Sequence, residues 1–452
     1  MSAALPAVFY FGDIPFGPGG TCTRGEERSL MDLVALRRDV HAHPEPAFCE
    51  VRTAATVLAH LRELPVEVRT GVAAMRREGV PAYPDEATLR DFADRAVATG
   101  ADAADVRRFA TEGTAIIADL AGRRPGPVWA LRFDMDALPV TEADDPAHTP
   151  AADGFRSRYE GFMHACGHDG HVAIGLALAR RLADRDFPGT VRFLFQPAEE
   201  GGRGARAMLA ADAVAGVDRF LAVHLGLDLP ATTVAAGITG IFATTKMRAR
   251  FTGVASHAAA APEDGRNALL AAATAVLGIH GLPRFSAADT RVNVGTLRAG
   301  GNVNIVPAAA ELTCEARSTD GAVNADLTER IKQVLCGAAQ AQGVAVEIEE
   351  TGGSTSLNCD DELLDAVLAA AAATGHGERA LRTHEMGGSD DASLFAEAVQ
   401  RAGGLATYTV IGGGNPAPHH NPYFDVDEAA LPVAVDVLEA LVRQTTRTDD
   451  NT

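Results

Sequence analysis

The sequence contains no apolar run approaching the roughly 18 residues that a membrane-spanning helix needs, and it is poor in positive charge. Its 40 lysines and arginines are outnumbered by 60 acidic residues, which gives a formal net charge of −20. This charge argues against nucleic acid or an anionic membrane as a partner. The N-terminus also lacks the basic segment and the clear cleavage site of a signal peptide. We therefore predict a cytoplasmic protein that binds neither membranes nor nucleic acids.

Cysteine is scarce, with six residues in a chain of 452 and no Cys-x-x-Cys pair. A chain of this length can bury a core without disulfide bonds. The pattern is therefore typical of free thiols in a reducing compartment. The length also exceeds that of one typical domain, so two domains are expected.

Short apolar runs that resemble strands alternate with helical segments in two parts of the chain. This order is typical of a mostly parallel sheet that is covered by helices on both faces. The fold class is therefore expected to be α/β. The runs that predict strands lie at 128–133, 191–195, 220–223 and 406–411, and a helix is predicted over 171–183.

Residues 239–348 show a different pattern, in which strands and helices follow one another in a βαββα-like order. We expect them to form a separate, smaller α+β domain that acts as a lid. Strand-like stretches lie at 247–251, 291–294 and 309–315, and helical stretches lie at 268–279 and 327–341.

The predicted lid divides the catalytic α/β domain into a first part at 29–238 and a second part at 349–445. Residues 76–113 are rich in charge, and they are expected to form a surface insertion in the first part, with a helix over 86–98. Residues 1–28 are rich in glycine and proline and predict a loosely docked arm. The sequence does not assign a role to this arm or to the insertion.

Side chains that suit metal ions follow each of the four predicted strands. In open parallel sheets, ligands bind beyond the carboxyl ends of the strands. Four strand ends that each deliver such a side chain predict a metal site at one edge of the sheet. The residues in these positions are Asp134, Asp136, Glu199, Glu200, His224, His419 and His420.

A fifth cluster, HACGHDGH at 164–171, combines a thiol, imidazoles and a carboxylate. This set suits a borderline cation such as Zn²⁺ or Mn²⁺. A lone cysteine is usually a small buried apolar residue, but Cys166 stands between two histidines, which favours a ligand. His164 and His171 could equally support a ligand or pack in the interior. A ligating imidazole needs its second nitrogen held by a carboxylate or a carbonyl. The carboxylates available for this are Asp134, Asp136 and Asp169.

The pair Glu199-Glu200 follows a predicted buried strand and Pro197. Neighbouring carboxylates in such a place can divide two roles. One binds metal, and the other accepts a proton from the attacking water and returns it to the leaving amine. The alternative is a solvated acidic pair at the start of a helix.

Three residues of the predicted lid carry groups that a hydrolase could use. His257 follows a strand-like segment, where a lone histidine is more often structural. Arg317 could hold a substrate carboxylate through two parallel hydrogen bonds, or it could be an ordinary surface arginine. Asn304 precedes an apolar turn at 305–307 and lies in the same predicted domain.

These motifs together resemble the M20 peptidase family, in its aminoacylase, hippurate hydrolase and auxin-conjugate hydrolase branch. The resemblance extends over about residues 30–440. Several separate motifs in the same order make it specific. They are DMDALP at 134–139, HACGHDGH at 164–171, QPAEEG at 196–201, Ser256-His257, NIVP at 304–307 and HHNPYFDVDE at 419–428.

The resemblance implies a lid that also dimerises and two divalent cations, with Mn²⁺ favoured and Zn²⁺ as the alternative. Glu199 would be the general base, and Asp136 would be a carboxylate that orients the site. His257 would reach into the partner subunit's active site and stabilise the oxyanion. Asn304 and Arg317 would hold the α-carboxylate of the substrate. The implied metal ligands are Cys166, His168, Glu200, His224 and His420.

Segments at 79–101, 195–208 and 243–273 are similar to a narrower branch, the p-aminobenzoyl-glutamate hydrolases, of which the insertion is the distinguishing mark. This similarity implies metal-dependent hydrolysis of p-aminobenzoyl-glutamate, as in folate catabolism. One alternative is another N-acyl amino acid, such as indole-acetyl-aspartate or a hippurate-like conjugate. An alternative of another class is an inactive scaffold subunit that pairs with an active homologue. The expected assembly is a homodimer or a heterodimer with a homologous subunit.

Three positions depart from the pattern of the wider family. Asp134-Met135-Asp136 replaces His-x-Asp, and Cys166 replaces a bridging aspartate. Both changes are shared by this branch, and they leave the choice between Mn²⁺ and Zn²⁺ open. Asp390 stands where a glutamate is common, so its contacts are not predicted.

Overall fold

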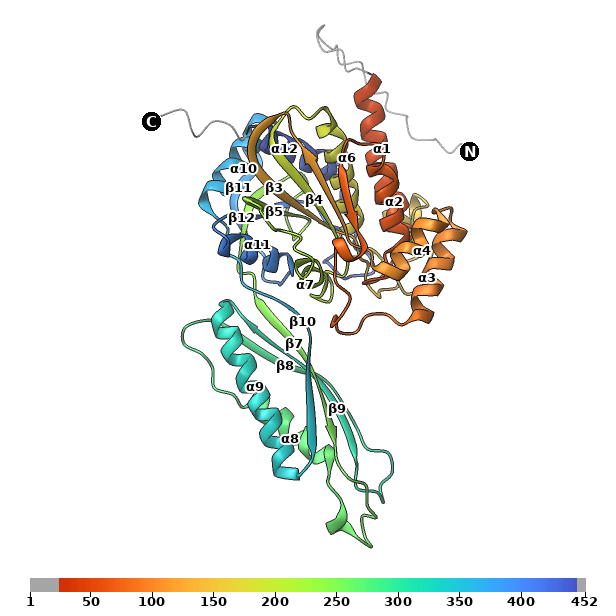
Figure 1. Cartoon of the computed structure of the whole chain (residues 1–452), viewed down its shortest axis with the longest axis vertical. Coiled ribbons are helices and arrows are strands. Elements are labelled where there is room, and N and C mark those ends of the chain that lie inside the picture. Colours follow the sequence, from red (N-terminus) through yellow and green to blue (C-terminus); the bar gives the residue numbers. More distant parts are fainter. Residues whose placement is uncertain (1–23, 445–452) are drawn as a thin grey trace, which may run out of the picture.

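The computed structural model describes residues 24–444, with side chains from Leu33 onward, and most of the predicted N-terminal arm lies outside these residues. The structure is built on two β-sheets, each of which is covered by helices (Figure 1). The larger one has eight strands in the order β1-β2-β4-β3-β5-β12-β6-β11. Its strands are β1 (Glu67–Thr70), β2 (Ile116–Ala121), β3 (Arg124–Asp134), β4 (Pro188–Gln196), β5 (Arg219–Leu225), β6 (Val234–Thr239), β11 (Ala380–Glu385) and β12 (Leu405–Ile411).

The four central strands β4, β3, β5 and β12 are parallel to one another. Helices cover both faces of this sheet, which confirms the predicted α/β class. One face carries α1 (Arg24–His41), α2 (Val51–Leu61), α6 (His168–Arg181), α10 (Asp361–Ala373) and α12 (Ala430–Gln444). The other face carries α7 (Gly204–Leu209) and α11 (Ala392–Arg401).

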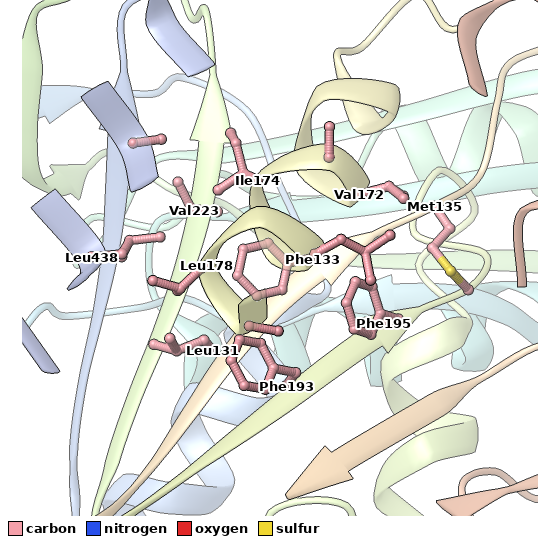
Figure 2. Close-up of a cluster of buried hydrophobic side chains, with 14 of the residues drawn as sticks. Leu131, Phe133, Met135, Val172, Ile174, Leu178, Phe193, Phe195, Val223 and Leu438 are labelled. Atoms are coloured by element: carbon pink, nitrogen blue, oxygen red, sulfur yellow. The ribbon is translucent and has the colours of Figure 1, made fainter. Parts of the chain in front are cut away.

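Close packing between α6 and the sheet fixes the start of this helix. Phe133 and Phe195 project from neighbouring strands beneath α6, with ring centroids 5.8 Å apart (Figure 2). A Cβ atom at Gly175 would lie 2.9 Å from both rings. Glycine therefore permits this close approach of helix to sheet. Because α6 is held in this way, its first turn is fixed beside the carboxyl end of β3.

The predicted helix over 171–183 begins earlier, at His168. The physical reason is Gly167, whose φ of 88° is readily adopted by glycine and turns the chain directly into the helix. The motif at 164–171 is therefore divided, because His168 and His171 lie in the helix while Cys166 lies in the preceding loop.

The predicted surface insertion contains α3 (Glu86–Ala98), as expected, and also α4 (Ala103–Glu112), which was not predicted. Both helices begin with an aspartate whose side chain accepts hydrogen bonds from the first turn. The remaining short elements of the large unit are α5 (Thr149–Ala152) and 3₁₀ turns at Gly71–Ala73, Leu182–Asp184 and Gly377–Arg379.

The second sheet has four antiparallel strands in the order β10-β7-β9-β8, and it projects away from the large sheet (Figure 1). We call the segment 243–354 the small unit. Two helices pack on one face of its sheet. Its elements are β7 (Ala243–Thr252), a 3₁₀ turn at Pro262–Asp264, α8 (Ala268–His280), β8 (Thr290–Ala299), β9 (Ala309–Ser318), α9 (Gly321–Gln342) and β10 (Ala345–Ser354).

Strand β10 was not predicted, and it runs past the predicted lid boundary at residue 348. Its sequence AVEIEE does alternate apolar and acidic residues, which is the pattern of a half-exposed strand. Together with β7, it carries the chain between the large unit and the small one. Among the described residues, no helix is both long and apolar enough to cross a bilayer.

Candidate metal centre

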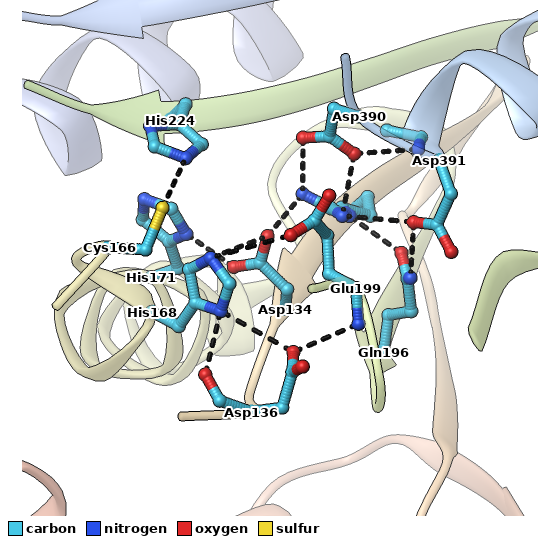
Figure 3. A network of polar contacts seen from close by, with 12 residues as sticks. Asp134, Asp136, Cys166, His168, His171, Gln196, Glu199, His224, Asp390 and Asp391 are labelled. Atoms are coloured by element: carbon cyan, nitrogen blue, oxygen red, sulfur yellow. Dashed lines mark hydrogen bonds and ion pairs between the residues drawn. The ribbon is translucent and has the colours of Figure 1, made fainter. Parts of the chain in front are cut away.

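The predicted ligands meet at the carboxyl edge of the large sheet. Figure 3 shows three of them, Cys166, His168 and His224. The predicted ligands form two overlapping sets, and within each set the ligand atoms lie within 4.8 Å of one another. One set is Cys166, His168 and His224, and the other is Cys166, Glu200 and His420. The thiol of Cys166 is therefore shared by both sets, which is the arrangement that a bridging ligand between two cations requires.

Hydrogen bonds orient two of the histidines for ligation. His168 Nδ1 lies 2.8 Å from the carbonyl oxygen of Asp136, and His224 Nδ1 lies 2.8 Å from that of Leu225. Since only a protonated nitrogen can donate to a carbonyl, Nε2 of each ring is free to face the centre. His168 Nε2 and Glu200 Oε1 are buried and have no hydrogen-bond partner among the described residues. Buried polar atoms without a hydrogen-bond partner are expected where they coordinate a cation.

The electrostatics also favour a cation. Burial, followed by the carboxylates of Glu200 and Glu199, raises the pKa of the Cys166 thiol well above its usual range. Burial and the nearby carboxylates of Asp390 and Glu200 raise the pKa of Glu199 as well. Divalent cations would supply the positive charge that favours thiolate and carboxylate in these positions.

Asp136 organises the turn after β4. Its carboxylate accepts hydrogen bonds from the backbone N–H groups of Glu199 at 2.9 Å and Glu200 at 3.1 Å. Because its carbonyl also holds His168, this one residue positions the proposed base and two of the proposed ligands. Ala198, directly before the pair, has a positive φ of 54°, which is uncommon for a residue with a side chain.

A buried arginine that the sequence reasoning missed balances the acidic groups behind Glu199. Arg132 on β3 is fully buried, and it forms a short ion pair with Asp134 and a 2.9 Å ion pair with Asp390. It also donates to Gln196 at 2.7 Å, and Gln196 in turn donates to Asp391 at 2.7 Å. The contacts of Asp390 are thus settled, because it faces Arg132 rather than the predicted ligands.

The remaining histidines have supporting roles. His171 donates from Nδ1 to Asp134 and accepts at Nε2 from the backbone N–H of Leu225, so both of its nitrogens are in use. His419, which was not among the implied ligands, accepts at Nε2 from the N–H of Leu227 and places Nδ1 3.4 Å from Cys166 Sγ. Its position next to His420, after a predicted strand, is the only signal for it in the sequence.

His164 and Asp169 lie outside the ligand sets. Asp169 forms ion pairs with Arg37 and His41, each at 2.8 Å. His164 is buried, packs against the ring of His41, and has no hydrogen-bond partner among the described residues. Of the three carboxylates considered as partners for ligating histidines, Asp169 therefore supports no ligand.

Of the three candidate site residues in the predicted lid, His257, Asn304 and Arg317, only Arg317 reaches this centre. It lines the same pocket as Cys166 and Glu199. Its guanidinium donates to Glu315 from Nε at 3.0 Å and from Nη2 at 3.1 Å. The outer edge of the guanidinium, formed by Nη1 and Nη2, remains available for a substrate carboxylate.

His257 and Asn304 lie at the opposite end of the small unit. Their loops are joined by a bridge between His257 and Ile305 and by a 3.0 Å hydrogen bond from Ala258 N to the carbonyl of Asn304. Strand β7 starts beside the large unit at Ala243 and runs to Thr252, a length of about 30 Å for ten residues. Within one chain, the structure does not bring Asn304 together with Arg317.

The site combines a cluster of thiol, imidazole and carboxylate ligands with a further carboxylate, and it lies at the carboxyl edge of a parallel sheet. This arrangement is typical of a metal-dependent hydrolase. Residues 130–444 match the model of peptidase family M20/M25/M40. The chain belongs to this family.

Two curated relatives are similar over nearly the whole chain. One of the subunits of p-aminobenzoyl-glutamate hydrolase from Escherichia coli (strain K12) is 43% identical, over 89% of this chain and 93% of the relative. The indole-3-acetyl-aspartic acid hydrolase of Enterobacter agglomerans is also 43% identical, over 90% of this chain and 94% of the relative.

Two solved structures share the fold. An aminobenzoyl-glutamate utilization protein from Klebsiella pneumoniae is 35% identical, with a TM-score of 0.79 over 93% of this chain and 98% of that one. A dinuclear metal-binding peptidase of the M20 family from Bacillus subtilis is 26% identical, with a TM-score of 0.65 over 93% of this chain and 99% of that one.

A first prediction concerns the contribution of the buried ion pairs of Arg132 to the stability of the fold. Replacing Arg132 with Met should reduce the free energy of unfolding by about 3–5 kcal/mol, because three carboxylates lose their counter-charge in the interior. Arg401→Met is the control, since Arg401 is exposed and pairs with Glu397 one helical turn away, and it should cost about 1 kcal/mol or less. Urea denaturation followed by circular dichroism measures both.

The pH dependence of this loss follows from the carboxylates. Although burial acts in the opposite direction, Arg132 and His168 hold the pKa of Asp134 well below its usual range. Without Arg132 that pKa rises, and a carboxylate with a raised pKa destabilises the fold above its unfolded pKa. The loss of unfolding free energy in Arg132→Met, relative to the wild type, should therefore become smaller as the pH falls from 8 to 5. Equal losses in both variants at every pH would contradict this account.

Proposed function

We propose that this enzyme hydrolyses the amide bond of p-aminobenzoyl-glutamate to p-aminobenzoate and glutamate. The observation that carries the proposal is the carboxylate of Glu199, which lies beside the two ligand sets that share Cys166, in a pocket that also contains Arg317. The similarity to the Escherichia coli hydrolase supports this choice of acyl group and amino acid. The second candidate is indole-acetyl-aspartate, because a relative named for that substrate is equally identical.

The proposed cofactor is a pair of divalent cations, with Mn²⁺ favoured and Zn²⁺ as the alternative. Cys166, His168 and His224 would hold one cation, and Cys166, Glu200 and His420 would hold the other. When bound, such cations lower the pKa of water and polarise the amide carbonyl. Thiolate, imidazole and carboxylate donors suit both metals.

Glu199 would act as the general base and then as the acid. Its backbone is fixed by Asp136, so its carboxylate is held at the pocket rather than in solvent. Burial and the neighbouring carboxylates of Asp390 and Glu200 raise the pKa of Glu199, so its ionised carboxylate would be a stronger acceptor for the proton of the attacking water. The same carboxyl group would then protonate the leaving nitrogen. The alternative of an inactive scaffold is less well supported, because a scaffold would not require the Glu199 carboxylate at this place.

We further propose that residues 239–348 form the lid and that residues 29–238 and 349–445 form the catalytic domain. The lid would also dimerise. Strand β8 lies at the edge of the small sheet, and the helix α8 beside it exposes Leu270 and Leu277. A second copy, or a homologous subunit, would cover this edge.

In such a dimer, His257 and Asn304 would serve the partner's site. The backbone N–H groups of Ala259 and Ala260 donate to His257 Nδ1, so a neutral ring carries its proton on Nε2. That nitrogen is an exposed donor suited to a developing oxyanion. Asn304, in the adjoining loop, would contact the same substrate in the partner's pocket.

The choice of substrate and metal is tested together. Metal-depleted protein, reconstituted with Mn²⁺ or Zn²⁺, should release p-aminobenzoate from p-aminobenzoyl-glutamate, and chromatography would measure the product. Indole-acetyl-aspartate and benzoyl-glycine complete the panel. Faster turnover of either compound would replace the first proposal with the second candidate or with a hippurate-like substrate.

Glu199→Gln should lower kcat by about 10²–10⁴, because the amide cannot accept the proton, while metal content stays unchanged. Metal analysis and product release measure the two properties on one sample. Glu397→Gln, at a helix surface position paired with Arg401, is the control and should keep full activity. Turnover that survives in the Glu199 variant would show that another group is the base.

Subunit mixing tests the role of His257. The His257→Ala variant should be inactive alone, and so should Glu199→Gln. An equal mixture should recover about a quarter of the wild-type activity, because half of the dimers are hybrids and each hybrid has one complete site. No recovery after confirmed subunit exchange would exclude action across the dimer.

A further inference from the structure

The small sheet turns one face toward the metal centre at its end near the large unit. On β7 and β9, the residues that pack against the helices alternate with residues on the opposite face. On this opposite face, Lys246 is paired in register with Glu315, and Thr244 with Arg317. Lys246 and Arg317 both line the pocket that contains Cys166, Glu199 and Glu200. Two cationic side chains of the small unit are therefore part of the wall of the site.

The other cations of this face on β7 and β9 have carboxylate partners. Arg248 and Arg250 both form ion pairs with Glu311 and Glu349. Arg317 is held by Glu315. Lys246 forms no ion pair or hydrogen bond within the usual distances with any residue that the structure describes. On β7 and β9, Lys246 is thus the described cation of this face that has no carboxylate partner. Arg298, at the far end of β8, does not line the pocket.

Lysine is also rare in this protein. The sequence contains two lysines, Lys246 and Lys332, against a much larger number of arginines. Lys332 lies on α9 and pairs with Glu350 at 2.8 Å on the surface of the small unit. The one lysine without a carboxylate partner thus lines the pocket, and the other provides a natural control.

We infer that Lys246 binds the side-chain carboxylate of the amino-acid part of the substrate, and that it makes the enzyme selective for N-acyl derivatives of acidic amino acids. This inference rests on the proposed amidohydrolase function. Arg317 would hold the α-carboxylate through its outer edge, as proposed above. The two carboxylates of a bound glutamate or aspartate would then each face one cation.

The charge of the substrate explains why a second cationic side chain, Lys246, would be needed beside Arg317. The pocket already contains the carboxylates of Glu199, Glu200 and Asp390, in a protein of net charge −20. The two proposed divalent cations would be engaged by their ligands and the amide carbonyl. A second negative charge on the substrate would therefore gain a partner of its own only from another cation within contact distance. A lysine side chain has a flexible four-carbon stem, so it could follow either a glutamate or an aspartate side chain. The two relatives that are 43% identical are named for a glutamate and an aspartate conjugate.

The experiment compares p-aminobenzoyl-glutamate with p-aminobenzoyl-glutamine, which has the same shape and α-carboxylate but no side-chain charge. Wild-type holoenzyme should favour the glutamate compound in kcat/KM by about 10- to 100-fold, the range expected for a hydrogen bond to a charged group. Lys246→Met should lose this preference by slowing the glutamate compound alone. Lys246→Arg should restore part of it, and Lys332→Met should leave it unchanged.

Several results would overturn the inference. One is an equal loss on both compounds in Lys246→Met, which would place Lys246 at the α-carboxylate or give it a structural role. Another is a preference that survives in Lys246→Met. If wild-type enzyme hydrolyses both compounds at the same rate, the inference fails while the amidohydrolase function stands. If it hydrolyses neither compound but cleaves other N-acyl amino acids, the proposed substrate itself is wrong.

Discussion

The ion pairs of Arg132 are the interaction on which the metal centre depends. The carboxyl ends of the parallel strands bring many acidic groups to one place, and most of them are buried. Arg132 faces Asp134 and Asp390 directly, and it lies 3.5 Å from Asp391. Tyr408 on β12 donates to the same Asp390 at 2.7 Å. One guanidinium thus ties β3 to the segment before α11 and leaves the carboxylates of Glu199 and Glu200 facing the pocket.

Three of the proposed ligands, Glu200, His224 and His420, come after short apolar strands, and the structure does bring them to one edge of the sheet. The carboxyl ends of parallel neighbours share one edge of the sheet, so local patterns around His224 and Glu200 also give their position in space. The pairing of Arg132 with Asp390 could not be predicted in the same way, since 258 residues separate them. Within its strand, Arg132 is one polar residue among apolar ones, and only the assembled fold shows that it faces buried carboxylates.

The residues of the small unit to which we assign roles lie at two distances from the connection with the large unit. Lys246 and Arg317 lie near this connection, where a rotation of the unit would move them least. The backbone N–H of Gly353 on β10 donates to the carbonyl of Gly202, three residues after Glu199, so the connection touches the catalytic turn itself. His257 and Asn304 lie about one strand length, roughly 30 Å, farther away. Residues so placed can serve a second site more readily than their own.

This distribution also shows how an acidic protein can use an acidic substrate. The net charge of −20 opposes the approach of a dianion over most of the surface. Arg248 and Arg250, farther along β7, are neutralised by Glu311 and Glu349, so they add little to the field at the pocket. The attraction would therefore come from groups within contact distance of the ligand: the two proposed divalent cations, Arg317 and Lys246. Because such attraction is short-ranged, it discriminates between substrates by the position of each carboxylate rather than by total charge.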